Sequence, residues 1–306
     1  MPVAARSRIL LGVAFLVSAL WTLTLLDTAG KLLALAGYHV VVIAWARYTL
    51  NTALMAATIA PLYRRRTGKS ILHSEQPRLQ IIRAVIMLMS TLIFFSVLKI
   101  VPLAEGTAMN FCAPLIVLAA SPWLLGERSR PSRWIAVAIG FSGMLIVVRP
   151  GGNIVPLGVA LGILSAITFA ALAIMNRKLN QRDDPLVTLF YGGLIGMLGS
   201  SMLVPFFWSS QVPDLREGLI LASTGITSTL GHFLLNSAYK HAEASMLTPF
   251  VYLQVVSATL MGWIVFGQLP DRLTVIGMAI ICASGMGIAY VEHRRFHRLQ
   301  VDREPG

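Results

Sequence analysis

The sequence predicts an all-α membrane protein with ten transmembrane helices, arranged as two inverted repeats of five helices each. The first observation is composition: 12% of the 306 residues are charged, 56% are hydrophobic and the mean hydropathy is +0.73. A soluble domain has about 25% charged residues, so a soluble enzyme is excluded. The other two observations are that the stretches between charges have the length of membrane helices, and that the two halves of the chain share short motifs.

Five apolar segments are expected in the first half, because a membrane helix needs about 20 mostly apolar residues. The first, 9–35, continues well beyond the apolar core of a signal peptide, so we expect an uncleaved span. The second, 39–63, is interrupted only by Arg47. The remaining three segments of this half are 82–101, 106–125 and the short 134–148.

Five more apolar segments are expected in the second half. They are 155–175, 186–208, 218–239, 245–266 and 273–291. Ten spans of about 20 residues fill roughly two thirds of the chain, which leaves no stretch long enough for a soluble domain. The polar stretch 64–78 is expected to be a loop, and 293–306 a cytoplasmic tail too short and too polar to fold.

The Lys and Arg residues are distributed unequally between the two sides of the membrane. If the N-terminus is cytoplasmic, 18 of the 25 fall on the cytoplasmic side and 4 on the opposite side, while Lys31, Arg47 and Arg83 fall within or at the edges of spans. This is the distribution of the positive-inside rule, so both termini are predicted to be cytoplasmic. We attribute the net charge of +12 to this topology and to anionic lipid, not to nucleic-acid binding.

Short motifs recur in the same order in the two halves. The Ser-Ala pair at 18–19 and the Lys-Leu pair at 31–32 recur 147 residues later, and the Ser-Gly-Met run at 142–144 recurs at 284–286. Because each repeat has an odd number of spans, the second copy must insert upside down relative to the first. Inverted repeats of this kind are typical of transporters, whose substrate site lies near the midplane between the copies.

Several longer stretches carry a family resemblance. PLAEGTAMNFCAPL, LLGERSRPSRW and GFSGMLIVVRPGG, with the later TPFVYLQVVSATLMGWIVFGQLPDRLTVIGMAIICASGMG, resemble the drug/metabolite transporter superfamily in its ten-span EamA-type branch. The resemblance covers nearly the whole chain but specifies no substrate. It implies EamA-type repeats at 1–150 and 151–292, around a cavity lined mainly by spans 1, 3, 4, 6, 8 and 9. It also implies transport of small metabolites across a bacterial inner membrane. Gln268 departs from the family, whose second copy more often has Glu there.

Nine polar or aromatic residues within the spans are candidates for substrate binding. They are Trp21, Asp27, Lys31, Arg47, Asn110, His232, Asn236, Tyr252 and Gln254. A charge at the bilayer centre costs about 2.5–3.5 kcal/mol, so an embedded charge needs a partner or water.

The embedded charges leave alternatives open. Asp27 and Lys31 lie four residues apart on one helix face, either as a self-compensating pair near the outer interface or as a contact for a zwitterionic substrate. Arg47 lies too deep to snorkel easily, and it either pairs with Asp27 or binds substrate. Arg83, at the cytoplasmic start of its span, is expected to snorkel.

The uncharged candidates also have two interpretations each. His232 and Asn236 share a helix face, where the histidine is either a packed, hydrogen-bonded group or a site of proton coupling. Trp21 either stacks on a planar substrate or packs against another helix. Asn110, Tyr252 and Gln254 should face a cavity or another helix. A further group of small residues is read as a close-packing face: Gly192, Gly193, Gly196 and Gly199.

An enzyme is not expected. The GFSG run at 140–143 and the His-x-x-x-Asn spacing at 232–236 match motifs of rhomboid intramembrane proteases, but in reversed order. The recurrence of Ser-Gly-Met at 284–286 instead favours a packing element in a duplicated scaffold. No phosphate loop or metal-ligand motif is present, and Cys112 and Cys282 lie in apolar runs, so no cofactor or metal is expected.

The sequence therefore predicts a secondary-active inner-membrane transporter of a small polar or zwitterionic metabolite, working by alternating access. Export is favoured, on the family resemblance alone. The alternative within the same fold is an uptake permease for a vitamin or an S-adenosylmethionine-like compound. The alternative from another class is a membrane scaffold that does not transport. A coupling proton and a homodimer are left open as partners.

Overall fold

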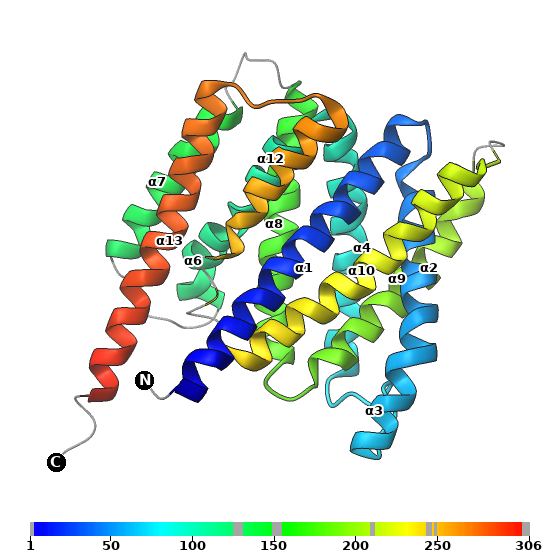
Figure 1. The fold of residues 1–306 in the computed structure, drawn as a ribbon, viewed down its shortest axis with the longest axis horizontal. Coiled ribbons are helices and arrows are strands. Elements are labelled where there is room, and N and C mark those ends of the chain that lie inside the picture. The colour runs from blue at the N-terminus through cyan, green and yellow to red at the C-terminus, as the bar shows by residue number, and fades with distance from the viewer. Residues whose placement is uncertain are drawn as a thin grey trace.

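The computed structural model describes residues 3–124, 131–148, 155–208, 212–242, 247 and 250–301. Within these ranges the chain is almost entirely helical and contains no strand (Figure 1). The first half contains α1 (Val3–Leu35), α2 (Val40–Leu54), η1 (Met55–Ile59), α3 (Ala60–Thr67), α4 (Pro77–Ile100), α5 (Leu103–Asn110), α6 (Ala113–Leu124) and α7 (Pro131–Val148). The second half contains α8 (Pro156–Leu179), α9 (Pro185–Phe207), α10 (Leu215–His241), α12 (Leu253–Phe266) and α13 (Arg272–Val301).

Apolar helices occupy the predicted spans. Seven helical stretches in the described ranges are long and apolar enough to cross a membrane: Leu10–Leu35, Val40–Thr67, Pro77–Ile100, Leu103–Ala120, Pro156–Leu179, Pro185–Phe207 and Leu215–His241. Shorter apolar helices cover the other three predicted spans, at Trp134–Val148, Leu253–Phe266 and Arg272–Gly287. The prediction of an all-helical, multi-pass membrane protein is thus confirmed at this level.

Proline explains two interruptions that the sequence prediction did not include. Pro61 has no N–H to donate, and the preceding turn widens into the π-helical η1, in which Ala60 N–H bonds to Met55 O. Pro114, in the first turn of α6, likewise cannot continue the hydrogen bonds of α5, so the predicted single span 106–125 is two helices separated at Phe111 and Cys112.

Two predicted boundaries were wrong. The loop expected at 64–78 begins only after Thr67, because α3 continues through the basic residues to the C-cap Gly68, which has a φ of 71°. The tail expected to be unfolded from residue 293 continues α13 as far as Val301. Extending an existing helix costs far less free energy than nucleating one, which explains both extensions into polar sequence.

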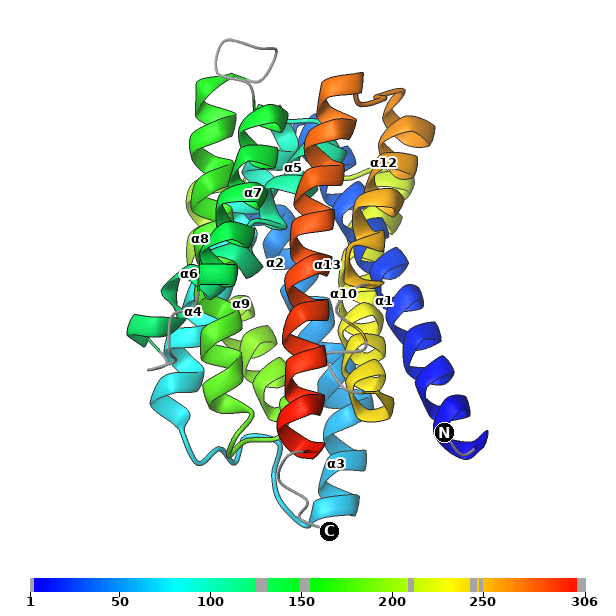
Figure 2. The same ribbon diagram turned by 90° about the vertical axis from the view of Figure 1, so that its left-hand side faces the viewer.

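The long helices lie side by side in a bundle (Figures 1 and 2). The closest pairs are α1 with α10, α4 with α8 and α9, α2 with α9 and α10, and α7 with α13, while α12 packs against α1 and α5. The start of α1, the end of α13 and helix α3 all lie at the lower end of the bundle in both views. An apolar core, with the fully buried Phe95, Leu98 and Met109, fills the space among α1, α4, α5, α7, α12 and α13.

A glycine stripe on α9 permits the close approach of α2 and α4. A Cβ atom at Gly196 would lie 2.6 Å from the Tyr48 ring, and one at Gly193 would lie 2.7 Å from Asn51 Oδ1. One at Gly199 would lie 2.7 Å from the Leu88 side chain. The predicted role of these glycines in close helix packing is confirmed.

Gly196→Ala should therefore destabilise the protein by about 1–3 kcal/mol, because the added methyl group overpacks the contact with Tyr48. The matched control is Gly218→Ala, because a Cβ there meets nothing within 4 Å and should leave stability unchanged or raise it through helix propensity. Thermal unfolding of the purified variants in detergent measures both effects. Equal melting temperatures for the two variants would contradict the packing role.

Candidate functional site

Arg47 lies in the interior of the bundle, on the face of α2 that packs toward α4 and α10. Its side chain is 8% exposed. Its Nε donates to Ser228 Oγ at 3.1 Å, its Nη1 donates to Thr91 Oγ1 at 3.4 Å, and the guanidinium lies 5.2 Å from the ring centre of Tyr48. All of these partners are uncharged, so the positive charge is solvated but not neutralised.

Asp27 on α1 is the carboxylate that was expected to pair with Arg47. In the described part of the chain no hydrogen bond or ion pair joins the two residues, although they are close enough to interact electrostatically. Two opposite charges thus approach each other from α1 and α2 without direct contact. This arrangement leaves both groups available to a third, bound group.

Lys31 is held at another junction. Its Nζ donates to Val101 O at 2.6 Å, lies 5.3 Å from the ring centre of Phe266, and interacts electrostatically with Glu105. No ion pair with Asp27 is present among the described residues, so the self-compensating pair expected from the i, i+4 spacing does not form. Val101 follows the last residue of α4, where backbone carbonyls lack helical partners, and Lys31 supplies the missing donor.

His232 and Asn236 continue the line of Ser228 along α10 at steps of four residues. The Nε2 atom of His232 and the Nδ2 atom of Asn236 are buried, and neither has a hydrogen-bond partner in the structure. His232 lies close enough to Arg47 and Arg83 to interact electrostatically with both. Since an unpaired buried polar atom costs about 1–3 kcal/mol, these atoms indicate a place where a water molecule or ligand binds.

Asn110 and Tyr252 lie elsewhere in the bundle. Asn110 Oδ1, at the end of α5, accepts a hydrogen bond from Ser165 Oγ of α8 at 2.8 Å. The Tyr252 ring packs against Phe111 with centroids 5.2 Å apart, and its hydroxyl occupies the space where Gly285 of α13 has no side chain. Both residues join helices across the bundle, as the sequence interpretation allowed.

The nine predicted residues therefore do not form a single cluster. Asp27, Arg47, His232 and Asn236 make up what we call the central cluster. Trp21, on α1, is 37% exposed. In the described part of the chain, no hydrogen bond or ring contact joins Trp21 or the Gln254 side chain to the central cluster.

Arg83 was expected to snorkel toward the cytoplasm, and this expectation was wrong. Its side chain is 5% exposed and points inward, with Nε donating to Asn176 Oδ1 at 2.9 Å and Nη1 to Thr188 O at 3.4 Å. Gly192 makes this possible, because a Cβ there would lie 2.6 Å from Arg83 Nη1. The sequence held a signal for this: Gln80, Arg83, Ser90 and Thr91 fall on one face of an otherwise apolar helix.

Asp183, in the turn between α8 and α9, was not among the predicted residues either. Its carboxylate is 7% exposed and accepts hydrogen bonds from Ser74 Oγ at 2.5 Å, Glu75 N at 2.8 Å and Gln80 Nε2 at 2.8 Å. Burial alone would raise the pKa of Asp183, but these hydrogen bonds outweigh burial and hold the pKa below its ordinary value. The carboxylate thus fastens the α8–α9 turn to the segment that leads into α4.

The motif shared with rhomboid proteases has a packing role. Ser142 Oγ donates to Ile139 O of its own helix at 2.7 Å. Gly143 and Gly277 face each other where α7 crosses α13, since a Cβ on either would lie within 2.8 Å of the other's carbonyl oxygen. Within the described ranges, no group of three or more His, Cys, Asp or Glu side chains could hold a metal ion.

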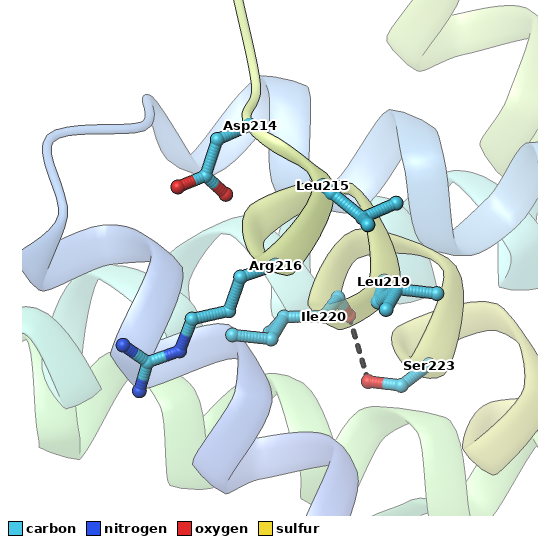
Figure 3. Close-up of a pocket in the computed structure, with 6 residues that line it drawn as sticks. All are labelled: Asp214, Leu215, Arg216, Leu219, Ile220 and Ser223. Carbon is cyan, nitrogen blue, oxygen red and sulfur yellow. Dashed lines mark hydrogen bonds between the residues drawn. The ribbon is translucent and has the colours of Figure 1, made fainter.

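A wide hollow of about 670 Å³ opens at the start of α10 (Figure 3). Its lining residues are Asp214, Leu215, Arg216, Leu219, Ile220 and Ser223. Asp214 and Glu217 form a capping box there, and Tyr38 donates to Glu217 Oε2 at 2.8 Å. The hollow includes no residue of the central cluster and is explained by the cap of the helix.

Comparison with known proteins gives the family. The sequence pattern of the EamA-like transporter family matches residues 156–290. An uncharacterised transporter of Helicobacter pylori is 32% identical over 213 residues, which cover 68% of this chain and 72% of that protein. The chain belongs to the EamA-like transporter family. The resemblance to EamA-type members of the drug/metabolite transporter superfamily is thereby confirmed.

Other relatives of this EamA-type protein are named for their substrates. An S-adenosylmethionine uptake transporter of Rickettsia bellii is 27% identical over 227 residues, covering 74% of this chain and 77% of that protein. A riboflavin transporter of Rhizobium johnstonii is 25% identical over 232 residues, covering 76% of each. A protein of known crystal structure matches 93% of the chain with a TM-score of 0.63 at 20% identity, which shows a shared fold.

Asp183→Asn should lower the free energy of unfolding by about 1–3 kcal/mol at pH 7, because a neutral amide replaces a carboxylate that accepts three hydrogen bonds. A depressed pKa stabilises the folded state above the unfolded pKa of about 4, and this stabilisation is lost as the pH falls through the folded value. The difference in melting temperature between the wild type and Asp183→Asn should therefore shrink below about pH 4. The control is Glu75→Gln, which neutralises an exposed carboxylate in the segment that Asp183 contacts. An equal loss of stability in this variant would contradict the role of Asp183.

Proposed function

We propose that this EamA-family protein is a secondary transporter that takes up a small polar or zwitterionic metabolite by alternating access. The observation that carries the proposal is the central cluster, an assembly of unneutralised charges and unpaired buried polar atoms inside a transporter-family bundle. The sequence alone favoured export. The relative named for S-adenosylmethionine uptake supports the alternative of uptake instead.

The charges of the central cluster suit a zwitterion. A guanidinium binds a carboxylate through charge-assisted hydrogen bonds, so Arg47 is placed to hold a substrate carboxylate. Asp27, on the neighbouring helix, would hold an ammonium or another cationic group. His232 and Asn236 would add hydrogen bonds through the two atoms that lack partners in the structure. Each of these contacts would offset the free-energy cost of burying the charged or polar group that makes it.

We further propose ten spans in two inverted repeats, 1–150 and 151–292. The helix contacts support a two-fold relation between the halves, because exchanging each helix with its counterpart reproduces the closest helix pairs. Helices α1, α2 and α4 of the first half are the counterparts of α8, α9 and α10 of the second half. The contact of α1 with α10 therefore corresponds to that of α8 with α4, and the contact of α2 with α10 to that of α9 with α4. The pairs α2 with α9 and α7 with α13 correspond to themselves. Such a relation provides two similar half-structures that open alternately to either side.

Uptake by purified protein in liposomes tests the function. Radiolabelled S-adenosylmethionine and riboflavin are the probes, each offered with and without an inward proton or sodium gradient. The wild type should accumulate at least one of them. Arg47→Gln should reduce uptake about 10-fold or more, since a charged hydrogen bond contributes about 1.5–3 kcal/mol to binding.

Lys99→Gln is the matched control, because it removes an exposed basic charge at the end of α4 and should leave uptake unchanged. Should Arg47→Gln and His232→Gln both fold and transport normally, the central cluster is not the substrate site. If the liposomes take up neither probe, and no component of a cell metabolite extract either, the transport proposal is wrong. The membrane scaffold that does not transport would then remain.

Topology is tested by reporter fusions. We propose a bacterial inner-membrane location with both termini cytoplasmic, supported by the clustering of the start of α1, the end of α13 and the arginines of α3 at one end of the bundle. Alkaline phosphatase fused after Val301 should be inactive, whereas the enzyme fused after Ala36, between α1 and α2, should be active. The opposite pattern would reverse the orientation.

A further inference from the structure

The interior of the bundle holds one more positive charge than it neutralises. Arg47 and Arg83 are both buried, and each donates hydrogen bonds only to uncharged partners in the described part of the chain. Asp27 is the acidic group that interacts with Arg47. Lys31 is a separate case, because it interacts with Glu105 at the junction of α4 and α5. Among the described residues, Arg47 thus interacts with one carboxylate, and no carboxylate interacts with Arg83.

The two guanidinium groups lie along one face of α4. Arg83, Met87 and Thr91 follow one another at steps of four residues, and Arg83 Nη1 donates to Met87 Sδ at 3.1 Å. Arg47 reaches the same face at Thr91. At 1.5 Å per residue, Arg83 and Thr91 are separated by about 12 Å along the helix.

Polar and apolar side chains both lie between the two arginines, and the apolar ones, including Met87 and Leu88, pack against Tyr48. Tyr48 bridges this space, because its hydroxyl bonds to Thr91 Oγ1 at 2.7 Å and donates to Met87 O at 3.3 Å. His232, with its unpaired Nε2, interacts electrostatically with both guanidinium groups. An anionic group that leaves Arg47 along this face of α4 would therefore find hydrogen-bonding side chains on its way to Arg83.

We propose that Arg83 is a second binding position for the substrate's anionic group, and that the protein accordingly selects substrates that carry a carboxylate. The inference rests on the proposed transport function and deepens it, since it names the substrate class and the next contact along the path. Arg47 holds the carboxylate in the central cluster, and Arg83 receives it about two helical turns further along α4.

A purely structural role for Arg83 does not explain its charge. The bonds from Arg83 to Asn176 and Thr188 fasten α4 to α8 and α9, but an uncharged donor would fasten them without the cost of a buried charge. A substrate carboxylate compensates that cost each time it binds.

The test is a binding measurement on the full-length protein in detergent, with two probes that differ by one group. The probes are S-adenosylmethionine and its decarboxylated form, which lacks only the carboxylate. The wild type should bind the carboxylated probe at least 10-fold more tightly. Arg83→Gln should weaken this preference, with the remainder due to Arg47, while its affinity for the decarboxylated probe changes less than about twofold, whereas Arg83→Lys should retain the full preference. Arg78→Gln, an exposed arginine one turn earlier, should behave as wild type.

A second variant leaves Arg83 in place. Asn176→Asp puts a carboxylate at the position that now accepts from Arg83 Nε at 2.9 Å, so an internal anion competes with the substrate. This variant should fold stably and show a weakened preference for the carboxylated probe, as Arg83→Gln does. A purely structural role predicts an unchanged preference instead.

The outcomes separate the two proposals. If the wild type binds both probes equally, or binds riboflavin but neither of them, carboxylate selection is wrong while transport stands. An unchanged preference in Arg83→Gln and Asn176→Asp would assign Arg83 to helix packing alone. If the wild type binds none of the three compounds, the proposed substrate range fails, and the inference fails with it.

Discussion

A guanidinium group in the interior of a membrane protein must be surrounded by hydrogen-bond acceptors, since lipid offers none. Arg47 meets this requirement by bonding to Thr91 on α4 and Ser228 on α10, two helices from different halves of the chain. Three helices are therefore placed relative to one another by one side chain. The neighbouring bond from Asn51 to Thr229, at 2.9 Å, repeats the connection between α2 and α10 one turn further along.

Burial of these polar groups also requires room, and α9 provides it. Glycines of α9 stand opposite Tyr48, Asn51 and Arg83, which turn inward from α2 and α4. The polar interior and the small-residue stripe are two parts of one arrangement. An ordinary side chain on that stripe would displace the groups that line the interior.

The sequence was sufficient for the helices but not for the contacts among them. Apolar stretches predicted the helices because chain length and hydrophobicity alone decide whether a segment can span a bilayer. The glycines of α9 were interpreted correctly for a similar reason, since few roles other than close packing suit four small residues on one face. The sequence offered Lys31 and Arg47 as partners for Asp27 and could not show that neither makes direct contact with it, because this depends on how α1 and α2 are rotated about their axes.

Arg83 illustrates the same limit more sharply. Its position near the end of an apolar segment was compatible with snorkelling, and only the glycine at 192 on another helix decides that the guanidinium turns inward. The interruptions at Pro61 and Pro114 were visible as residues, but their effect on the hydrogen-bond register depends on the turn that accommodates each proline. The four residues of the central cluster were all named from sequence, while their association required the fold.

The widened turn η1 has a geometric consequence for the helix that follows it. A π-helical turn accommodates one extra residue, and one residue corresponds to about 100° of rotation about the helix axis. The face of α2 that is buried as far as Met55 is therefore not the same face after Ile59, and α3 has no buried residue. A helical wheel drawn through 40–67 as one regular helix would superimpose two unrelated faces. The bulge separates a helix that carries Arg47 into the bundle from one that presents arginines to the membrane surface.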